Sequence, residues 1–154
     1  MSDGFTLELR AVPPTLMLGL LATLDALHRE IQVTAFDGPG PSPVGRDTHD
    51  ALVEDRMQVE EARNAILDQA VAGRDAGRAR IDITAAYATE DIAPFRSARV
   101  GVAAAHAAAV RGDLLASPLT PDEHHLWTWV GTEFEAQAAG RPPTPFAPAG
   151  ERAG

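Results

Sequence analysis

Phe5-Thr6-Leu7-Glu8-Leu9-Arg10 and, further along, Ile81-Asp82-Ile83-Thr84-Ala85 are two short segments in which apolar and polar residues alternate. A strand with this period of two buries one face, and it cannot do so without a partner. We therefore expect the two strands to pair with each other. Each is followed by two segments of helical periodicity, which predicts a mainly α fold: a four-helix bundle with a small two-stranded β-ribbon, in the pseudo-repeated order βααβαα.

Start and stop signals give the bounds of the four helices. They are expected from Pro14 to about Phe36, from Asp47 or Thr48 to Gly73, from Glu90 through Val110, and from Thr120 to Gly140. The last has the clearest start, because a threonine cap precedes a proline and a glutamate stands three residues on. The expected inner face of the third helix comprises Ile92, Phe95, Val102, Ala103 and Val110, and that of the fourth comprises Trp127, Val130 and Phe134.

Length and the carboxyl-terminal segment set the domain organisation. A chain of 154 residues is long enough for one domain with a core. Residues 141–146 are rich in proline, so they are expected to be extended and to strap Phe146 against the helices. We predict one domain over residues 1–146 and a disordered tail over residues 147–154.

Composition excludes several classes of partner and chemistry. The formal net charge of −9 disfavours a nucleic-acid or membrane partner, because binding to phosphates comes largely from cationic groups. The chain has no cysteine, which excludes disulfides and thiolate catalysis. Residues 1–4 lack a basic targeting region and the longest apolar run is too short for a bilayer, so we expect a cytoplasmic protein.

His28 and His106 give one hypothesis about a site. On a helical wheel both fall on apolar faces, and in an up-down bundle they could meet near the axis. Glu123 or Asp25 could add a carboxylate, which predicts a site for a divalent metal or a small ligand, with or without an enzymatic activity. The alternative is a core histidine held by one hydrogen bond, because two histidines without a defined third ligand do not specify a metal site. Under that alternative no cofactor is expected.

A second hypothesis concerns an interaction surface. The second helix is strongly acidic, with Glu54 and Glu61 among the residues that could steer a partner, although such faces are commonly only solvated. Trp129 falls beside Glu133 at the edge of the apolar stripe, where a tryptophan can anchor an interface. It could equally pack under the proline-rich tail.

Motifs for catalysis are missing from the sequence. His124 and His125 diverge by about 100° on a regular helix, so they cannot bind one ion together. No serine or threonine lies in a nucleophile elbow, and the glycines near residue 40 lack the spacing of a nucleotide loop. The sequence thus disfavours, without excluding, an enzymatic activity.

The stretch Trp127-Thr128-Trp129-Val130, the pair Glu133-Phe134, the segment 140–146 and Leu9-Arg10-Ala11-Val12-Pro13 together resemble a family of small actinobacterial proteins. Its members tend to be encoded beside anti-sigma-factor kinases, STAS-type antagonists and their phosphatases. The resemblance implies a regulatory context in a partner-switching stress circuit and no catalytic residue. We therefore expect a non-enzymatic protein-interaction module of bacterial signalling that binds a partner protein or a second copy of itself.

Overall fold

The computed structural model describes residues 4–36 and 59–150. Two strands, four α-helices and a short 3-10 turn follow one another in this part of the chain: β1 (Phe5–Val12), α1 (Pro14–Phe36), α3 (Glu60–Asp75), β2 (Ile81–Tyr87), the turn (Thr89–Asp91), α4 (Ile92–Val110) and α5 (Pro121–Ala138). The mainly helical class is confirmed. The predicted start of the second helix, with Glu54, lies outside the described residues.

The two strands pair antiparallel, as their alternation predicts. Phe5 lies opposite Tyr87 and Leu9 opposite Ile83, and each strand extends two residues beyond its predicted end. Leu7, Leu9 and Ile83 are buried on one face, whereas the exposed residues between them leave the other face to solvent. The ribbon therefore contributes one apolar face to the core.

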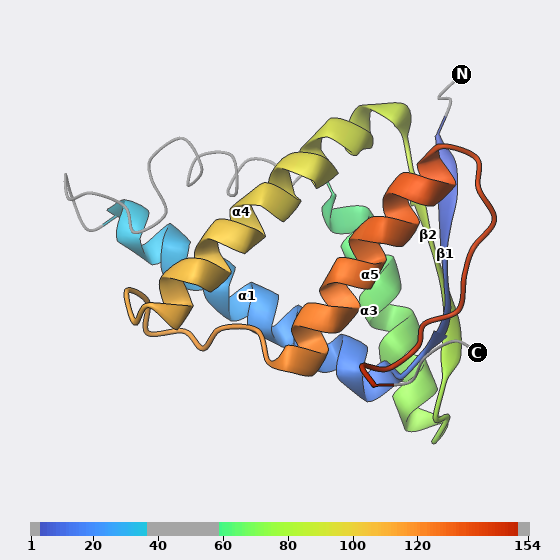
Figure 1. Cartoon of the computed structure of the whole chain (residues 1–154), viewed down its shortest axis with the longest axis horizontal. Coiled ribbons are helices and arrows are strands. Elements are labelled where there is room, and N and C mark those ends of the chain that lie inside the picture. Colours follow the sequence, from blue (N-terminus) through green and yellow to red (C-terminus); the bar gives the residue numbers. More distant parts are fainter. Residues whose placement is uncertain (1–3, 37–58, 151–154) are drawn as a thin grey trace.

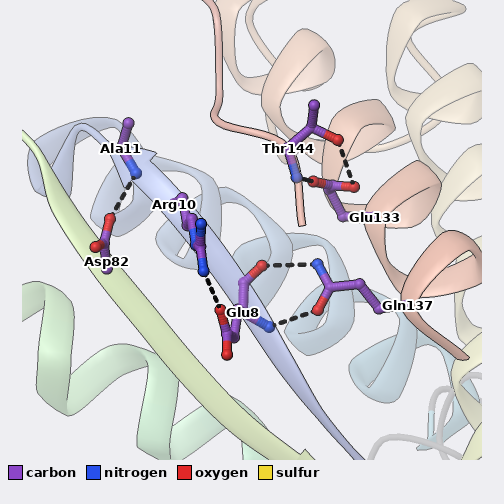
Figure 2. Close-up of polar contacts among 7 residues, drawn as sticks. All are labelled: Glu8, Arg10, Ala11, Asp82, Glu133, Gln137 and Thr144. Atoms are coloured by element: carbon purple, nitrogen blue, oxygen red, sulfur yellow. Dashed lines mark hydrogen bonds and ion pairs between the residues drawn. The ribbon is translucent and has the colours of Figure 1, made fainter. Parts of the chain in front are cut away.

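A bulge near the end of β1 holds a strained residue. Arg10 and Ala11 lie opposite the single residue Asp82, and Ala11 has a left-handed φ of 58°. The Asp82 carboxylate accepts the Ala11 N–H at 3.0 Å, and Arg80 donates to the Ala11 carbonyl at 3.5 Å (Figure 2 shows the first of these). A side chain with a Cβ disfavours this conformation, which the two polar contacts maintain.

Ala11→Gly is expected to raise the free energy of unfolding by about 0.5–1 kcal/mol, because glycine adopts the left-handed region without a Cβ clash. Chemical denaturation followed by circular dichroism measures the change. Ala86→Gly is the matched control, since Ala86 is exposed on β2 and has no positive φ. It should lower stability by about the same amount; a loss in both variants would contradict the strain at Ala11.

Two glutamine side chains form hydrogen bonds with the backbone at the two outer edges of the ribbon, at residues that face each other. The Gln137 side chain accepts the Glu8 N–H and donates to the Glu8 carbonyl, both at 2.8 Å (Figure 2). On the other edge the Gln69 side chain accepts the Thr84 N–H at 2.9 Å and donates to the Thr84 carbonyl at 2.6 Å. Glu8 and Thr84 are opposite each other in the register, so the side-chain amides continue the hydrogen-bonded row on both sides.

The helices surround the buried face of the ribbon. α3 packs against β2, α5 packs against β1, and α1 contacts α3, α4 and α5. In Figure 1, α4 and α5 slant in similar directions while α1 runs across both. The four-helix bundle is not confirmed, because α1 crosses its neighbours instead of lying along them, and the pseudo-repeat stays a prediction.

An aromatic cluster forms the centre of the core. Phe134 is fully buried, and its ring lies 3.8 Å from that of Phe95, 5.0 Å from Tyr87 and 5.1 Å from Phe5 between centroids. These rings come from β1, β2, α4 and α5. The cluster joins elements that are far apart in the sequence.

Two residues predicted for the inner face of α4 are exposed. Phe95 and Val102 are buried as expected, but Ala103 is exposed and Val110 is 64 % exposed. The prediction was wrong for both, because alanine occupies all sides of this helix between residues 103 and 109 and leaves the apolar stripe poorly defined.

The start of α5 and the position of Phe146 agree with the sequence. Thr120 caps α5 and makes the predicted capping box with Glu123. After α5, the proline-rich segment 141–146 returns along β1 (Figure 1), where the buried Phe146 donates its N–H to the Arg10 carbonyl at 2.9 Å. None of the described helices combines the length and hydropathy needed to cross a membrane.

Candidate functional site

A cleft of about 550 Å³ lies between α4 and α5. From α4 it is lined by Arg96, Arg99, Val100, Val102, Ala103 and His106, and from the α5 side by Leu119, His124, Trp127 and Thr128. Arg99 follows Arg96 by three positions and His106 follows Arg99 by seven, which places the three side chains along one side of α4. We call this hollow the α4/α5 cleft. Its lining contains four cationic or titratable nitrogen groups and no carboxylate.

Arg96 ties the two helices together at one end of the cleft. Its guanidinium donates two hydrogen bonds of 2.8 Å to the Glu135 carboxylate on α5. These bonds lower the pKa of Glu135, since they favour its charged form. The charge of Arg96 is therefore already compensated.

Arg99 differs from Arg96 because it acts on the Glu135 carboxylate only from a distance and does not contact it. It makes no ion pair with any carboxylate of residues 4–36 and 59–150. Its guanidinium packs on Gly131 of α5 so closely that a Cβ on this glycine would lie 2.2 Å from Arg99 Cζ. The glycine thus makes the space in which this cation sits.

His106 has a fixed tautomer. Its Nδ1 accepts the N–H of Leu119 at 3.0 Å, so in the neutral ring the proton is on Nε2. Its ring centroid lies 5.2 Å from that of His124, at the start of α5. Burial, and to a lesser extent the nearby His124, lowers the pKa of His106. The cleft therefore presents a neutral imidazole that is already anchored on one side.

The lowered pKa predicts a pH dependence of stability. The neutral form of His106 is favoured in the folded state, so its contribution is complete above the ordinary value of 6.5 and is lost as the pH falls through the lower folded value. His106→Asn keeps an acceptor near Nδ1 but does not titrate. The difference in unfolding free energy between the wild type and this variant should therefore be larger at about pH 7.5 than at about pH 5, in urea titrations. A difference that is constant across this range would contradict the assignment.

The predicted metal ligands His28 and His106 border different hollows of the molecule. His28 is buried on α1, where its Nδ1 lies 3.3 Å from the Leu24 carbonyl, and it borders an apolar cavity of about 100 Å³. His106 borders the α4/α5 cleft instead. Glu123 is buried as well, and its Oε1 accepts from the Thr23 hydroxyl at 2.9 Å and from the Thr120 N–H at 3.1 Å. Within residues 4–36 and 59–150, no three His, Asp or Glu side chains are grouped so that they could hold a metal ion.

The predicted interaction residues do not share one surface. Trp129 packs edge-on against Phe146 of the tail at 5.2 Å, which is the alternative position that the sequence left open. Glu133 is only 2 % exposed, and its carboxylate accepts the Thr144 N–H at 2.5 Å and the Thr144 hydroxyl at 3.3 Å (Figure 2). Glu133 is therefore a buried residue that binds the proline-rich segment through Thr144. Its predicted place on an exposed interaction surface was wrong. Glu61 is exposed on α3, and Glu54 lies outside the described residues.

Sequence reasoning missed Arg96, Arg99 and Trp127 as a group. The spacing of the two arginines from His106 on α4 was visible in the sequence, as was the spacing of Trp127 from His124 on α5. The relative position of the two helices was not, and only that position brings the groups to one cleft.

No protein-family model, curated protein or solved structure matches the chain.

Proposed function

We propose that this protein is a non-enzymatic protein-interaction module of bacterial signalling that binds an acidic, partly apolar segment of a partner protein in the α4/α5 cleft. The observation that supports this most is the lining of the cleft. In a chain of net charge −9, the cleft gathers two arginines and two histidines without a carboxylate. Because Glu135 compensates Arg96 and also acts on Arg99, the attraction for an anionic group would come from the guanidinium of Arg99 and the ring N–H of His106.

The apolar part of the cleft favours a protein segment over a small free anion. Trp127 is half-buried between this cleft and the core, and Val100 on the opposite wall is 69 % exposed. An apolar side chain of the partner could pack against this tryptophan and this valine. Buried contacts of this kind carry much of the binding energy of an interface. Trp127 thereby replaces Trp129 as the proposed anchor.

The regulatory context rests on the resemblance to small actinobacterial proteins encoded beside anti-sigma-factor kinases. A cytoplasmic location and a place in a stress or sigma-factor circuit belong to this proposal. A cleft that binds without transferring groups suits a module whose role is recognition.

Selection from a phage library of short random peptides tests the proposal. Peptides that bind the wild-type protein should be enriched in Asp and Glu together with large apolar residues. Arg99→Glu reverses the charge of this side chain, so it should weaken their binding at least about tenfold, or about 1.4 kcal/mol, in isothermal titration calorimetry.

Arg78→Glu is the matched control, because Arg78 is exposed and does not line the cleft. It makes the same change in net charge and should alter the affinity by less than about twofold at physiological salt. Equal losses in the two variants would indicate a general charge effect and contradict a docking site in the cleft. Basic consensus peptides, or binding that Arg99→Glu leaves intact, would also contradict it.

The alternative of a metal or small-ligand site at His28 and His106 is tested separately by elemental analysis of untagged protein. Stoichiometric metal that is lost in His28→Leu and His106→Leu would support that alternative. A second copy of the chain as partner would appear as a concentration-dependent mass in light scattering that Arg99→Glu reduces.

A further inference from the structure

We infer that the protein has a second binding site, apart from the α4/α5 cleft: the apolar cavity beside His28 binds one small, uncharged, apolar molecule about the size of a single six-membered ring. The cavity has a volume of about 100 Å³ and is lined from all four described helices and from both strands. The inference does not depend on the proposed function, because the cavity and the cleft differ in lining and in the chemical class that they would bind.

Apolar side chains form nearly the whole wall of the cavity. The buried residues of this wall include Leu9, Leu20, Ile66, Tyr87, Phe95 and Val130. A water molecule in such surroundings finds few hydrogen-bond partners, whereas an apolar molecule gains contacts with side chains that are already out of water. The lining therefore favours an apolar occupant.

The polar side chains that border the cavity make bonds within the protein. Arg63 of α3 forms an ion pair with the Asp25 carboxylate of α1. The Nδ1 of His28 lies 3.3 Å from the Leu24 carbonyl of its own helix. An ionic molecule in the cavity would lose its hydration and would meet two charges that are already paired with each other, so an uncharged molecule is favoured.

A small residue on α4 makes room for the cavity. Ala98 follows Phe95 by three positions and precedes Val102 by four, so the three residues share one side of the helix, and all three line the cavity. The middle one contributes a single methyl group. A leucine at this position would extend into the space that the alanine leaves.

The volume limits the size of the occupant. Pockets for drug-sized ligands hold about 300–1,000 Å³, whereas an apolar cavity of about 150 Å³ in another protein binds benzene. The cavity of about 100 Å³ is therefore of the size for a single ring or a short hydrocarbon and too small for a long acyl chain.

Two side chains distinguish the cavity from the cleft. Met17 is 2 % exposed and lines the cavity but not the cleft, whereas Val100 lines the cleft but not the cavity. Trp127 and Val102 border both hollows and cannot separate them. Binding in the cavity should shift the NMR signal of the Met17 methyl group and leave those of the Val100 methyl groups unchanged.

Benzene is the probe, added to the full-length protein with ¹³C-labelled methyl groups. We expect a saturable shift of the Met17 signal with a dissociation constant on the order of 1 mM, which is within the range that six carbon atoms can supply. Ala98→Leu adds three carbon atoms to the wall, so it should weaken benzene binding at least about tenfold. Because this change fills a cavity, it should not lower the midpoint of thermal unfolding.

Ala98→Val is the second variant, for the case that the leucine variant does not fold. It adds two carbon atoms at the same position and should weaken benzene binding at least about threefold. Ala107→Leu is the matched control, because Ala107 is exposed on the same helix and lines neither hollow. It should bind benzene within about twofold of the wild type.

A Met17 signal that does not saturate, or a shift of the Val100 signals in its place, would overturn the inference. So would benzene binding that folded Ala98 variants retain, or equal losses in Ala98→Leu and Ala107→Leu. Neither Ala98 nor Ala107 lines the α4/α5 cleft, so acidic peptides should bind both leucine variants. Failure of benzene binding with intact peptide binding leaves the proposed function standing, and the opposite result leaves the cavity site standing.

Discussion

Phe134→Ala is expected to lower the free energy of unfolding by about 3–5 kcal/mol, the range for truncating a buried aromatic side chain. Phe134 is 0 % exposed and contacts the rings of Phe5, Tyr87 and Phe95. Its removal leaves a cavity where both strands meet α4 and α5. Domains of this size have only about 5–15 kcal/mol of stability, so this loss is a large fraction of the total free energy of unfolding.

Urea denaturation followed by circular dichroism measures this loss, and Phe134→Leu keeps it measurable if the alanine variant does not fold. Leu115→Ala is the control for loss of an apolar side chain, because Leu115 is 99 % exposed and should change stability by less than about 0.5 kcal/mol. A loss of less than about 1.5 kcal/mol in Phe134→Ala would show that the aromatic cluster is not the centre of the core.

Gln137→Ala is expected to cost about 2–3 kcal/mol, since it removes two hydrogen bonds and leaves a backbone N–H and C=O of β1 without partners in a partly buried site. Gln69→Ala removes the same two bonds from the opposite residue of β2. That site is exposed and open to water, so the expected loss is only about 0.5–1 kcal/mol.

The two glutamine variants control for each other, because the chemistry removed is identical and only the burial differs. Hydrogen exchange of the Glu8 and Thr84 amides shows whether each loss is local to its strand. Equal losses of stability in the two variants would contradict the account that burial of the Gln137 amide makes its bonds to β1 the more valuable pair.

The parts of the fold that depend on local chemistry could be predicted from the sequence. Alternation in residues 5–10 and 81–85 gave the antiparallel pair, because a strand with one apolar face needs a partner. The cap and proline at Thr120-Pro121 gave the start of α5, and the prolines before Phe146 gave the strap. Each signal lies within a few residues of the structure that it specifies.

The parts that depend on the relative position of helices could not be predicted. The alanines of α4 fit any side of a helix, so the buried face of this helix was misassigned at Ala103 and Val110. The contact between Arg99 and Gly131 could not be predicted for the same reason. A glycine in a helix indicates a close approach only when the facing helix and its side chains are known. The helical wheel placed Glu133 beside Trp129, and both residues do face the same segment. That side of α5 is covered by Thr144 and Phe146 of the proline-rich segment.

The most direct test of recognition in the α4/α5 cleft is the affinity of the selected acidic peptides for Gly131→Ala, measured by isothermal titration calorimetry. The added methyl group would lie 2.2 Å from Arg99 Cζ, so the guanidinium must move while the net charge stays unchanged. Alanine also favours the helix by about 1 kcal/mol, which should keep the variant folded. The account predicts affinity about tenfold weaker than that of the wild type, with no loss of thermal stability. Unchanged affinity in a variant that has displaced Arg99 would contradict the claim that the partner is held through this cation.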